Sequence, residues 1–356
     1  MKKFKNLLIY TAMFTGVVLY SCEGPAGKDG VNGQDGIDGA TGTAQCQVCH
    51  NNDQQMAEKM GQYNSSFHAM GENAAYANNS SAACTQCHVS QGFVDYIANG
   101  KVSNTVKYTD PLQPNCYTCH KIHKTYTETD WTLTTTDAVT LTHGGNTYDR
   151  GSSNLCANCH QARSLTPALP TVGGSDVTLS SSQTRWGTHH GPMANMLLGK
   201  GGYEVTGTFV SDYSTVTNPH YTQNSNGCVT CHMATPYGTM AGGHQLGLEY
   251  DQHGTVKMLT NGCTACHTNA TTLATLITDR KALTQSLLDD LQAKLVTAGI
   301  YNASTGLCNA GTYSADVAGA FINYQTIKED KSLGIHNPAY TEALLKNSIE
   351  KLTPKK

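Results

Sequence analysis

The pattern of hydrophobic positions is helical only near the end of the chain. In the first such segment, leucines recur at spacings of seven and four residues: Leu276, Leu283, Leu287, Leu291 and Leu295. Residues at these spacings share one face of an α-helix. Gly299 follows where a C-terminal cap belongs. We therefore predict a helix that ends before Gly299 and buries this leucine face.

Two more helices are predicted after it. One is expected over residues 315–330. The other should begin at Pro338, because proline suits the first helical position and Asn337 suits the N-cap. Its inward-facing side chains would be Leu344, Leu345, Ile349 and Leu352. Residues 271–356 should form a helical segment that packs on the preceding part of the chain.

Residues 46–270 lack a sustained hydrophobic period. Glycine, serine, threonine and asparagine are frequent there, which favours loops. Short helical turns are expected around recurring cysteine pairs, and the alternation over residues 203–209 predicts a short hairpin strand. The expected fold class is mainly irregular and α-helical, with short helices, few short strands and the C-terminal helices.

The N-terminus has the pattern of an export signal. Lys2, Lys3 and Lys5 precede an apolar stretch, residues 7–20, that is too short to span a bilayer. It ends in Leu-Tyr-Ser-Cys, which resembles a bacterial lipobox, so we predict a signal peptide over 1–21 and acylation of Cys22. The alternative is a plain secretory signal with an incidental cysteine.

Glycine then recurs at every third position over residues 24–44. A collagen-like triple helix is one interpretation. A flexible polar tether is favoured, because the segment has few triplets and a single proline, Pro25. The predicted organisation is a signal peptide at 1–21, an anchor and tether at 22–45, a cofactor-binding domain at 46–270 and the helical segment at 271–356.

Composition limits what the polypeptide can bury by itself. Of the 356 residues, 38% are apolar and 14% are charged, and both fractions are low for a globular protein. Either much of the chain is loop or something other than side chains fills the interior. The formal charge of −3 gives no reason to expect a nucleic-acid partner.

One five-residue pattern, Cys-x-x-Cys-His, accounts for twelve of the 14 cysteines. In chain order the copies are motif 1 (Cys46, Cys49, His50), motif 2 (Cys84, Cys87, His88), motif 3 (Cys116, Cys119, His120), motif 4 (Cys156, Cys159, His160), motif 5 (Cys228, Cys231, His232) and motif 6 (Cys263, Cys266, His267). This spacing is the signature of covalent c-type haem attachment. Two thiols one helical turn apart can each bond a porphyrin vinyl group, and the next residue then supplies an imidazole to the iron. The sequence predicts six haem c groups.

Other uses of paired cysteines explain the pattern less well. Structural zinc sites do not require a histidine after every second cysteine. Disulfides would leave the six motif histidines without a role. A thioredoxin-like redox motif normally occurs once, within a βαβ unit. Of the two other cysteines, Cys308 has no adjacent histidine, and we expect it to be a buried, unreactive thiol.

The second axial position of each iron needs a further ligand, either histidine or methionine. Nine histidines lie outside the motifs, a small surplus over six irons. The methionines are more often core residues than ligands.

Several segments resemble those of exported multihaem cytochromes, the lipoprotein or periplasmic electron-transfer proteins of anaerobic and metal-respiring bacteria. The resemblance runs from about residue 46 to 345 and is carried by FHA at 67–69, CYTCHKIH at 116–123, NLCANCHQAR at 154–163, HHGP at 189–192, GCVTCHM at 227–233, GGH at 242–244 and GIHNPAY at 334–340. It implies bis-histidine ligation, with these distal ligands: His68, His123, His190, His220, His244 and His336. The alternatives are His143, His189 and His253, and His189 could replace its neighbour His190.

Two of these ligands suggest how the haems are arranged. His123 follows His120 by three residues, so it cannot easily reach the same iron and should serve a neighbouring haem. His336 lies far from any motif, just before the Pro338 helix, and should hold the C-terminal helices to the haem array.

We therefore expect an electron carrier, not an enzyme, that relays electrons at the outer membrane or cell surface to other redox proteins or extracellular acceptors. The lipid anchor would tie it to the membrane. The alternatives are a multihaem reductase with one open iron, acting on nitrite, hydroxylamine or a sulfur oxyanion, and the protomer of a cytochrome filament or other homo-oligomer.

Overall fold

The helices are mostly short up to residue 232 and long at the C-terminus. The computed structural model describes residues 54–103 and 107–354, so motif 1, Cys22 and the predicted tether lie outside the described residues. The α-helices are α3 (Gln54–Asn64), α4 (Phe67–Met70), α5 (Asn73–Ser80), α6 (Ala82–His88), α7 (Ser90–Asn99), α8 (Cys116–Cys119), α9 (Asn154–Ala157), α10 (Met193–Leu198), α11 (Pro219–Thr222), α12 (Gly227–His232), α13 (Ala270–Thr297), α14 (Ala315–Asp330) and α15 (Pro338–Lys351). Single 3₁₀ turns occur at η1 (Glu128–Trp131), η2 (Gly151–Ser153), η3 (Tyr213–Thr215) and η4 (Gly243–Gln245).

The described strands form four small antiparallel pairs. They are β1 (Val139–Thr140) with β2 (Thr147–Tyr148), β3 (Val177–Leu179) with β8 (Gly311–Tyr313), β4 (Glu249–Gln252) with β5 (Thr255–Met258), and β6 (Tyr301–Asn302) with β7 (Leu307–Cys308). The β3–β8 pair joins segments far apart in sequence, with Val177 opposite Tyr313. This mainly irregular and helical architecture confirms the predicted fold class.

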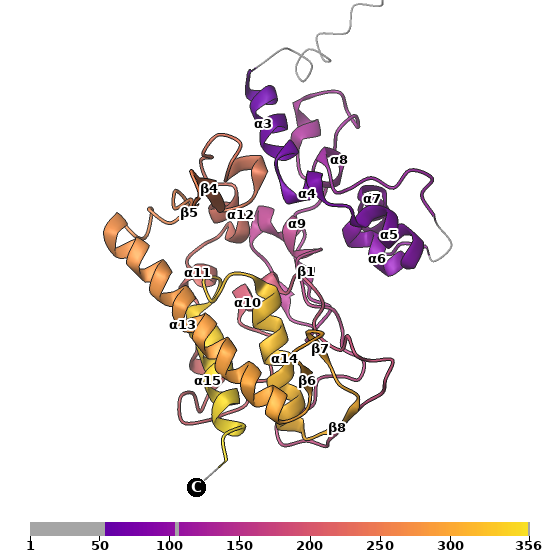
Figure 1. The fold of residues 1–356 in the computed structure, drawn as a ribbon. Helices are drawn as coiled ribbons and strands as arrows, with labels where there is room; N and C mark the ends of the chain where they lie inside the picture. The colour runs from indigo at the N-terminus through magenta and orange to yellow at the C-terminus, as the bar shows by residue number, and fades with distance from the viewer. Residues whose placement is uncertain (1–53, 104–106, 355–356) are drawn as a thin grey trace, which may run out of the picture. The chain divides into compact units, whose positions relative to one another are not determined.

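The main hydrophobic core lies between the C-terminal helices and the middle of the chain. Helices α13, α14 and α15 lie side by side (Figure 1). Their apolar faces share one buried cluster with residues such as Leu165, Trp186 and Met196. The cluster thus joins residues on both sides of the predicted boundary at 270. None of the described helices is long and apolar enough to cross a membrane.

The three C-terminal helices occur where the sequence predicts them. Helix α14 spans Ala315–Asp330, and α15 begins at Pro338 with the Asn337 side chain accepting a hydrogen bond from the backbone N–H of Tyr340. Leu344 and Leu345 are fully buried, and Ile349 and Leu352 are packed partly buried against the same core. Helix α13 ends at Thr297, and Ala298 caps it. Gly299 follows in a left-handed conformation, with φ 80°.

The buried face of α13 differs from the predicted one. Leu291 and Leu295 are buried as expected, but Leu276 and Leu283 are 52% and 37% exposed. Only the C-terminal half of the helix contributes several leucines to the shared core, through Leu288, Leu291 and Leu295. The first half buries only Leu273 among its leucines. Periodicity identified the helix but not where along its length the core begins.

The strand predicted at 203–209 is absent, because side chains replace a neighbouring strand there. Asn323 of α14 accepts the backbone N–H of Tyr203 at 2.7 Å and donates to its carbonyl at 2.8 Å. Asn347 of α15 donates to the carbonyl of Val205 at 2.9 Å. Both asparagines are fully buried. The segment is therefore held against the helices by side-chain hydrogen bonds, and the N–H of Val205 bonds the carbonyl of Tyr203 in a tight turn that a regular strand does not contain.

Replacing Asn323 with alanine should destabilise the fold. The change would leave the buried backbone N–H of Tyr203 without its partner, while the carbonyl of Tyr203 would still accept the N–H of Val205 at 2.8 Å. An unsatisfied buried group costs about 1–3 kcal/mol, so we expect the free energy of unfolding to fall by about that amount, measured by guanidinium titration. Gln285→Ala, which removes an exposed hydrogen bond to Asp289, should change it by less than about 0.5 kcal/mol. Equal effects from the two variants would contradict this role for Asn323.

Candidate functional site

Most of the described motifs are built on short helical turns. Helices α6, α8, α9 and α12 carry motifs 2 to 5, and motif 6 lies in a run of turns, residues 261–266. Local capping fixes these turns. Before motif 3, the Asn115 side chain accepts the N–H of Tyr117, and the Thr118 hydroxyl accepts the N–H of Asn115. Each turn brings two thiols to the same side and places the motif histidine at or just past its end.

Every described motif histidine faces a second histidine from a distant part of the chain. The ring centres are 6.0 Å apart for His160 and His68, 6.2 Å for His88 and His189, 6.3 Å for His120 and His244, 6.2 Å for His267 and His220, and 6.2 Å for His232 and His336. These five separations agree within a few tenths of an ångström, although the partners come from unrelated local structures.

The separation matches two imidazoles bound to opposite sides of one metal ion. A metal–imidazole bond is about 2 Å long, and each ring centre lies roughly 1 Å beyond its nitrogen, so two such rings have centres ~6 Å apart. Each pair could supply two nitrogen ligands to one metal ion. The described residues contain no group of three or more His, Cys, Asp or Glu side chains that could hold a metal ion. A pair of axial imidazoles beside two thiols fits a porphyrin iron, whose equatorial ligands are its own nitrogens.

Short capped turns hold the facing histidines. His68 lies in α4, where the Ser66 hydroxyl accepts the N–H of Ala69, and His220 lies in α11, which begins with Pro219 after the Asn218 cap. The 3₁₀ turn η4 carries His244.

Glutamine 62 fixes the position of η4. Its buried side chain accepts the backbone N–H of His244 at 3.0 Å. Gly243, at φ 53°, permits this close approach, since a Cβ there would lie 2.4 Å from the same Gln62 oxygen.

Hydrogen bonds at Nδ1 orient several rings. Backbone carbonyls accept from His120 (Trp131, 2.6 Å), His232 (Leu246, 2.7 Å) and His220 (Ile335, 2.8 Å). Because a carbonyl oxygen can only accept, Nδ1 must carry the hydrogen. In the neutral ring the lone pair is then on Nε2, the nitrogen available to a metal. His336 differs, since its Nδ1 contacts the carboxylate of Asp330 at 2.7 Å.

Burial keeps most of these imidazoles in the neutral, ligating form. Burial and neighbouring histidines lower the pKa of His160 to about 4, and burial with Arg163 and other cationic neighbours lowers the pKa of His189 to about 4. Burial likewise lowers the pKa of His68 and His244. At His336, burial lowers the pKa, but the Asp330 charge and hydrogen bond outweigh it and raise the pKa overall.

Motif 4 lies next to motifs 2 and 5. The Cys87 thiol lies 3.9 Å from the carbonyl of Asn158 in motif 4, and the Cys159 thiol lies 3.9 Å from the carbonyl of Gln86 in motif 2. The Ser153 hydroxyl, just before α9, accepts the N–H of Val229 in motif 5 at 3.0 Å. Interaction with the neighbouring motif's thiol and burial raise the pKa of Cys159 and of Cys156. The described cysteines form no disulfide.

Two further contacts extend this arrangement. The thiol of Cys119 in motif 3 is close enough to contribute to the raised pKa of Cys159. Burial and then Cys263 of motif 6 raise the pKa of Cys231 in motif 5 to about 11. A Cβ on Gly262, directly before motif 6, would lie 2.8 Å from the Cα of Cys231 in motif 5. Contacts therefore join motif 2 to motif 4, motif 4 to motif 5 and motif 5 to motif 6, and the charge of motif 3 reaches motif 4.

The structure places four of the six predicted distal histidines opposite a motif histidine: His68, His220, His244 and His336. It places a fifth, His190, elsewhere. Its side chain is 75% exposed and pairs with Glu329 at 2.7 Å, whereas His189 faces His88. The two histidines are adjacent in the sequence, so only tertiary packing determines which of them faces His88.

His123 and the remaining histidines lie in other environments. His123 stacks on Tyr126, and its Nδ1 lies 3.1 Å from the Tyr117 hydroxyl. His50 of motif 1 lies outside the described residues. His143 is buried against the carbonyl of Gly201 at 2.9 Å, and His253 occupies the β4–β5 turn.

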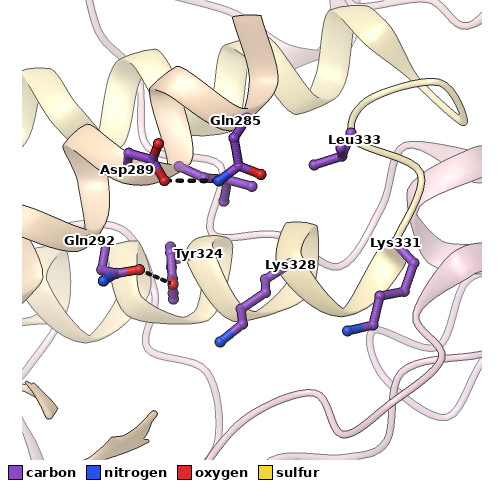
Figure 2. Close-up of a pocket in the computed structure, with 8 residues that line it drawn as sticks. Gln285, Asp289, Gln292, Tyr324, Lys328, Lys331 and Leu333 are labelled. Carbon is purple, nitrogen blue, oxygen red and sulfur yellow. Dashed lines mark hydrogen bonds between the residues drawn. The ribbon is translucent and has the colours of Figure 1, made fainter. Parts of the chain in front are cut away.

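Asp330 and the pocket between α13 and α14 were not predicted from the sequence. No sequence signal connects Asp330 with His336 six residues later, because the contact depends on an irregular loop. Figure 2 shows the pocket, lined by residues that include Gln292, Tyr324, Lys328 and Lys331. Its lining contains no histidine or cysteine. Cys308 is 2% exposed, as expected for a buried thiol.

Comparison with known proteins identifies the fold. No protein-family model matches the sequence, and no curated protein matches it significantly. Among solved structures, the outer cell wall cytochrome OcwA is similar with a TM-score of 0.50 and 19% identity, over 83% of this chain and 50% of that one. An undecahaem cytochrome from the S-layer of Carboxydothermus ferrireducens gives a TM-score of 0.46 and 20% identity, over 81% and 41%. The chain thus spans about half the length of the first structure and has a fold of the multihaem cytochrome type.

Proposed function

We propose that this chain is an electron-transfer protein that holds six c-type haems through motifs 1 to 6, each with two axial histidines. The observation that carries the proposal is the set of five imidazole pairs at 6.0–6.3 Å, one for every described motif. Haem supplies reversible one-electron chemistry when bound. The chain's part is to provide thioether cysteines, fix the ligand tautomers and set the spacing between neighbouring sites.

The proposed distal ligands are His68 for motif 4, His189 for motif 2, His244 for motif 3, His336 for motif 5 and His220 for motif 6. His123 is proposed for motif 1. Contacts between neighbouring motifs support transfer along 2, 4, 5 and 6, with motif 3 joining at motif 4. Bis-histidine ligation gives lower potentials than histidine–methionine ligation, which suits a carrier that passes electrons onward.

The facing histidines also bear on the reductase alternative. A haem reductase needs an iron with a vacant position, and in the described part of the chain each motif histidine already has an imidazole opposite it. This supports a carrier over a catalyst. We further propose that the mature protein is exported and anchored through Cys22, and that it exchanges electrons with other redox proteins. The name of the similar solved protein, an outer cell wall cytochrome, supports an extracytoplasmic location.

The haem content is tested by the mass and colour of protein made in cells with a cytochrome c maturation system. We expect a red protein whose mass includes six haems, and acyl chains at Cys22 if the anchor forms. The Cys263→Ala/Cys266→Ala variant should carry five haems. Chelators should remove no iron, because the thioether bonds are covalent. A colourless product, or metal that a chelator strips away, would overturn the proposal.

A further inference from the structure

The loop between α14 and α15 supports two facing histidines in different ways. The carbonyl of Ile335 accepts the Nδ1 hydrogen of His220, at 2.8 Å. The next residue, His336, directs its own Nδ1 to the carboxylate of Asp330, at 2.7 Å. Residues 331–337 therefore serve the sites of both motif 5 and motif 6. The distal histidine of motif 6, His220, therefore donates to a neutral carbonyl. The distal histidine of motif 5, His336, donates to an anionic carboxylate.

Several contacts fix the carboxylate in place. The Ser332 hydroxyl donates to its second oxygen and also accepts the backbone N–H of His336, at 3.2 Å. Lys331 adopts a left-handed conformation, φ 61°, that turns the chain sharply after α14. The Asp330 side chain is 1% exposed, and it forms an ion pair with His336.

This position is unfavourable for an aspartate by ordinary criteria. A buried carboxylate loses its hydration and is normally compensated by a cation. Asp330 is also the last residue of α14, where the negative end of the helix dipole disfavours an anion. The buried charge is therefore directed at one target, the ring of His336.

An anionic acceptor changes what a ligating imidazole does. Hydrogen bonds to ionised groups are roughly twice as strong as neutral ones. A stronger bond at Nδ1 shifts electron density to Nε2 and makes it a better donor to a metal, an effect known for carboxylate–histidine pairs. Greater donation stabilises the ferric over the ferrous state, so second-sphere hydrogen bonding is one determinant of haem potential.

We propose that Asp330 is a positioning residue that lowers the reduction potential of the motif 5 haem below that of the motif 6 haem. The inference rests on the proposed function. Motif 5 adjoins motif 6, so an electron on its haem is driven toward the motif 6 haem. The two distal ligands are supported by one loop, and the difference between Asp330 and the Ile335 carbonyl sets the direction of that step.

The test compares three variants of the full haem-loaded protein by spectroelectrochemical redox titration. Asp330→Asn keeps an accepting oxygen but removes the charge, so one component of the titration should move to higher potential. Ser332→Ala removes a hydrogen-bond donor from the carboxylate and concentrates its charge on His336, so the same component should move to lower potential. Asp316→Asn, a charge removal on the same helix at a residue bonded to Tyr203, should leave that component in place.

Electron paramagnetic resonance of the ferric protein adds a readout that depends on ligation. All three variants should remain fully low-spin, and Asp330→Asn should alter the g values of one signal. The inference fails if Asp330→Asn shifts every component equally, shifts none, or does no more than Asp316→Asn. If Asp330→Asn misfolds, the downward shift in Ser332→Ala still decides. A wild-type protein without haem would overturn the proposed function itself, whereas unchanged potentials in a haem-loaded variant overturn only this inference.

Discussion

Replacing His68 with methionine should trap electrons at motif 4 and slow their redistribution through the protein. Thioether ligation raises haem potentials relative to a second histidine. For a one-electron centre, each ~59 mV increase raises its equilibrium occupancy about tenfold. Because motif 4 contacts motifs 2 and 5, a trap there lies on the route between them. We expect redistribution of a single photo-injected electron to slow by at least about tenfold.

The matched control is His220→Met at motif 6, which ends the described series of contacts. The same chemical change should raise one potential by a similar amount, visible in a redox titration, while exchange among motifs 2, 4 and 5 keeps its wild-type rate. If the two variants slow redistribution equally, motif 4 is not central to the array. If His68→Met changes neither potential nor rate, His68 is not a ligand.

Replacing His189 with alanine should open one iron, whereas replacing His190 should not. His189 faces His88 at 6.2 Å, while His190 is exposed and paired with Glu329. In the His189→Ala variant we expect a high-spin ferric signal from one haem of six, measured by electron paramagnetic resonance. The His190→Ala variant should retain the low-spin spectrum of the wild type.

The adjacency of the two histidines makes each variant the control for the other. Both changes remove an imidazole from the same turn, so a general disturbance of the fold would affect both spectra. A high-spin signal in His190→Ala with a normal spectrum in His189→Ala would assign the ligand to His190 instead. Carbon monoxide binding to the reduced protein gives an independent count of open irons.

The sequence predicts features that depend on local chemistry. The Cys-x-x-Cys-His spacing predicts haem sites because the attachment reaction itself requires it. Helix α15 could be placed to the residue because Asn337 and Pro338 form a cap together. Helix α13 was also predicted, but its buried face was not, since Leu276 lies outside the core that takes up Leu291.

Features that depend on distant contacts could not be predicted in the same way. The segment at Tyr203 alternates in sequence as a strand would, yet its hydrogen-bond partner is Asn323, 120 residues later. No pattern in the sequence connects His160 with His68 or His232 with His336. Such pairings follow from the packing of the whole chain, and so does the choice between His189 and His190.

The loop that joins α14 and α15 has a consequence for how the protein is made. Motif 5 leaves the ribosome before His336, the residue that faces it. During synthesis its thiols are therefore exposed while the opposite side of the site is still open. Closure waits for the last two helices, so a nascent chain stays accessible for modification and becomes sealed only when its end arrives.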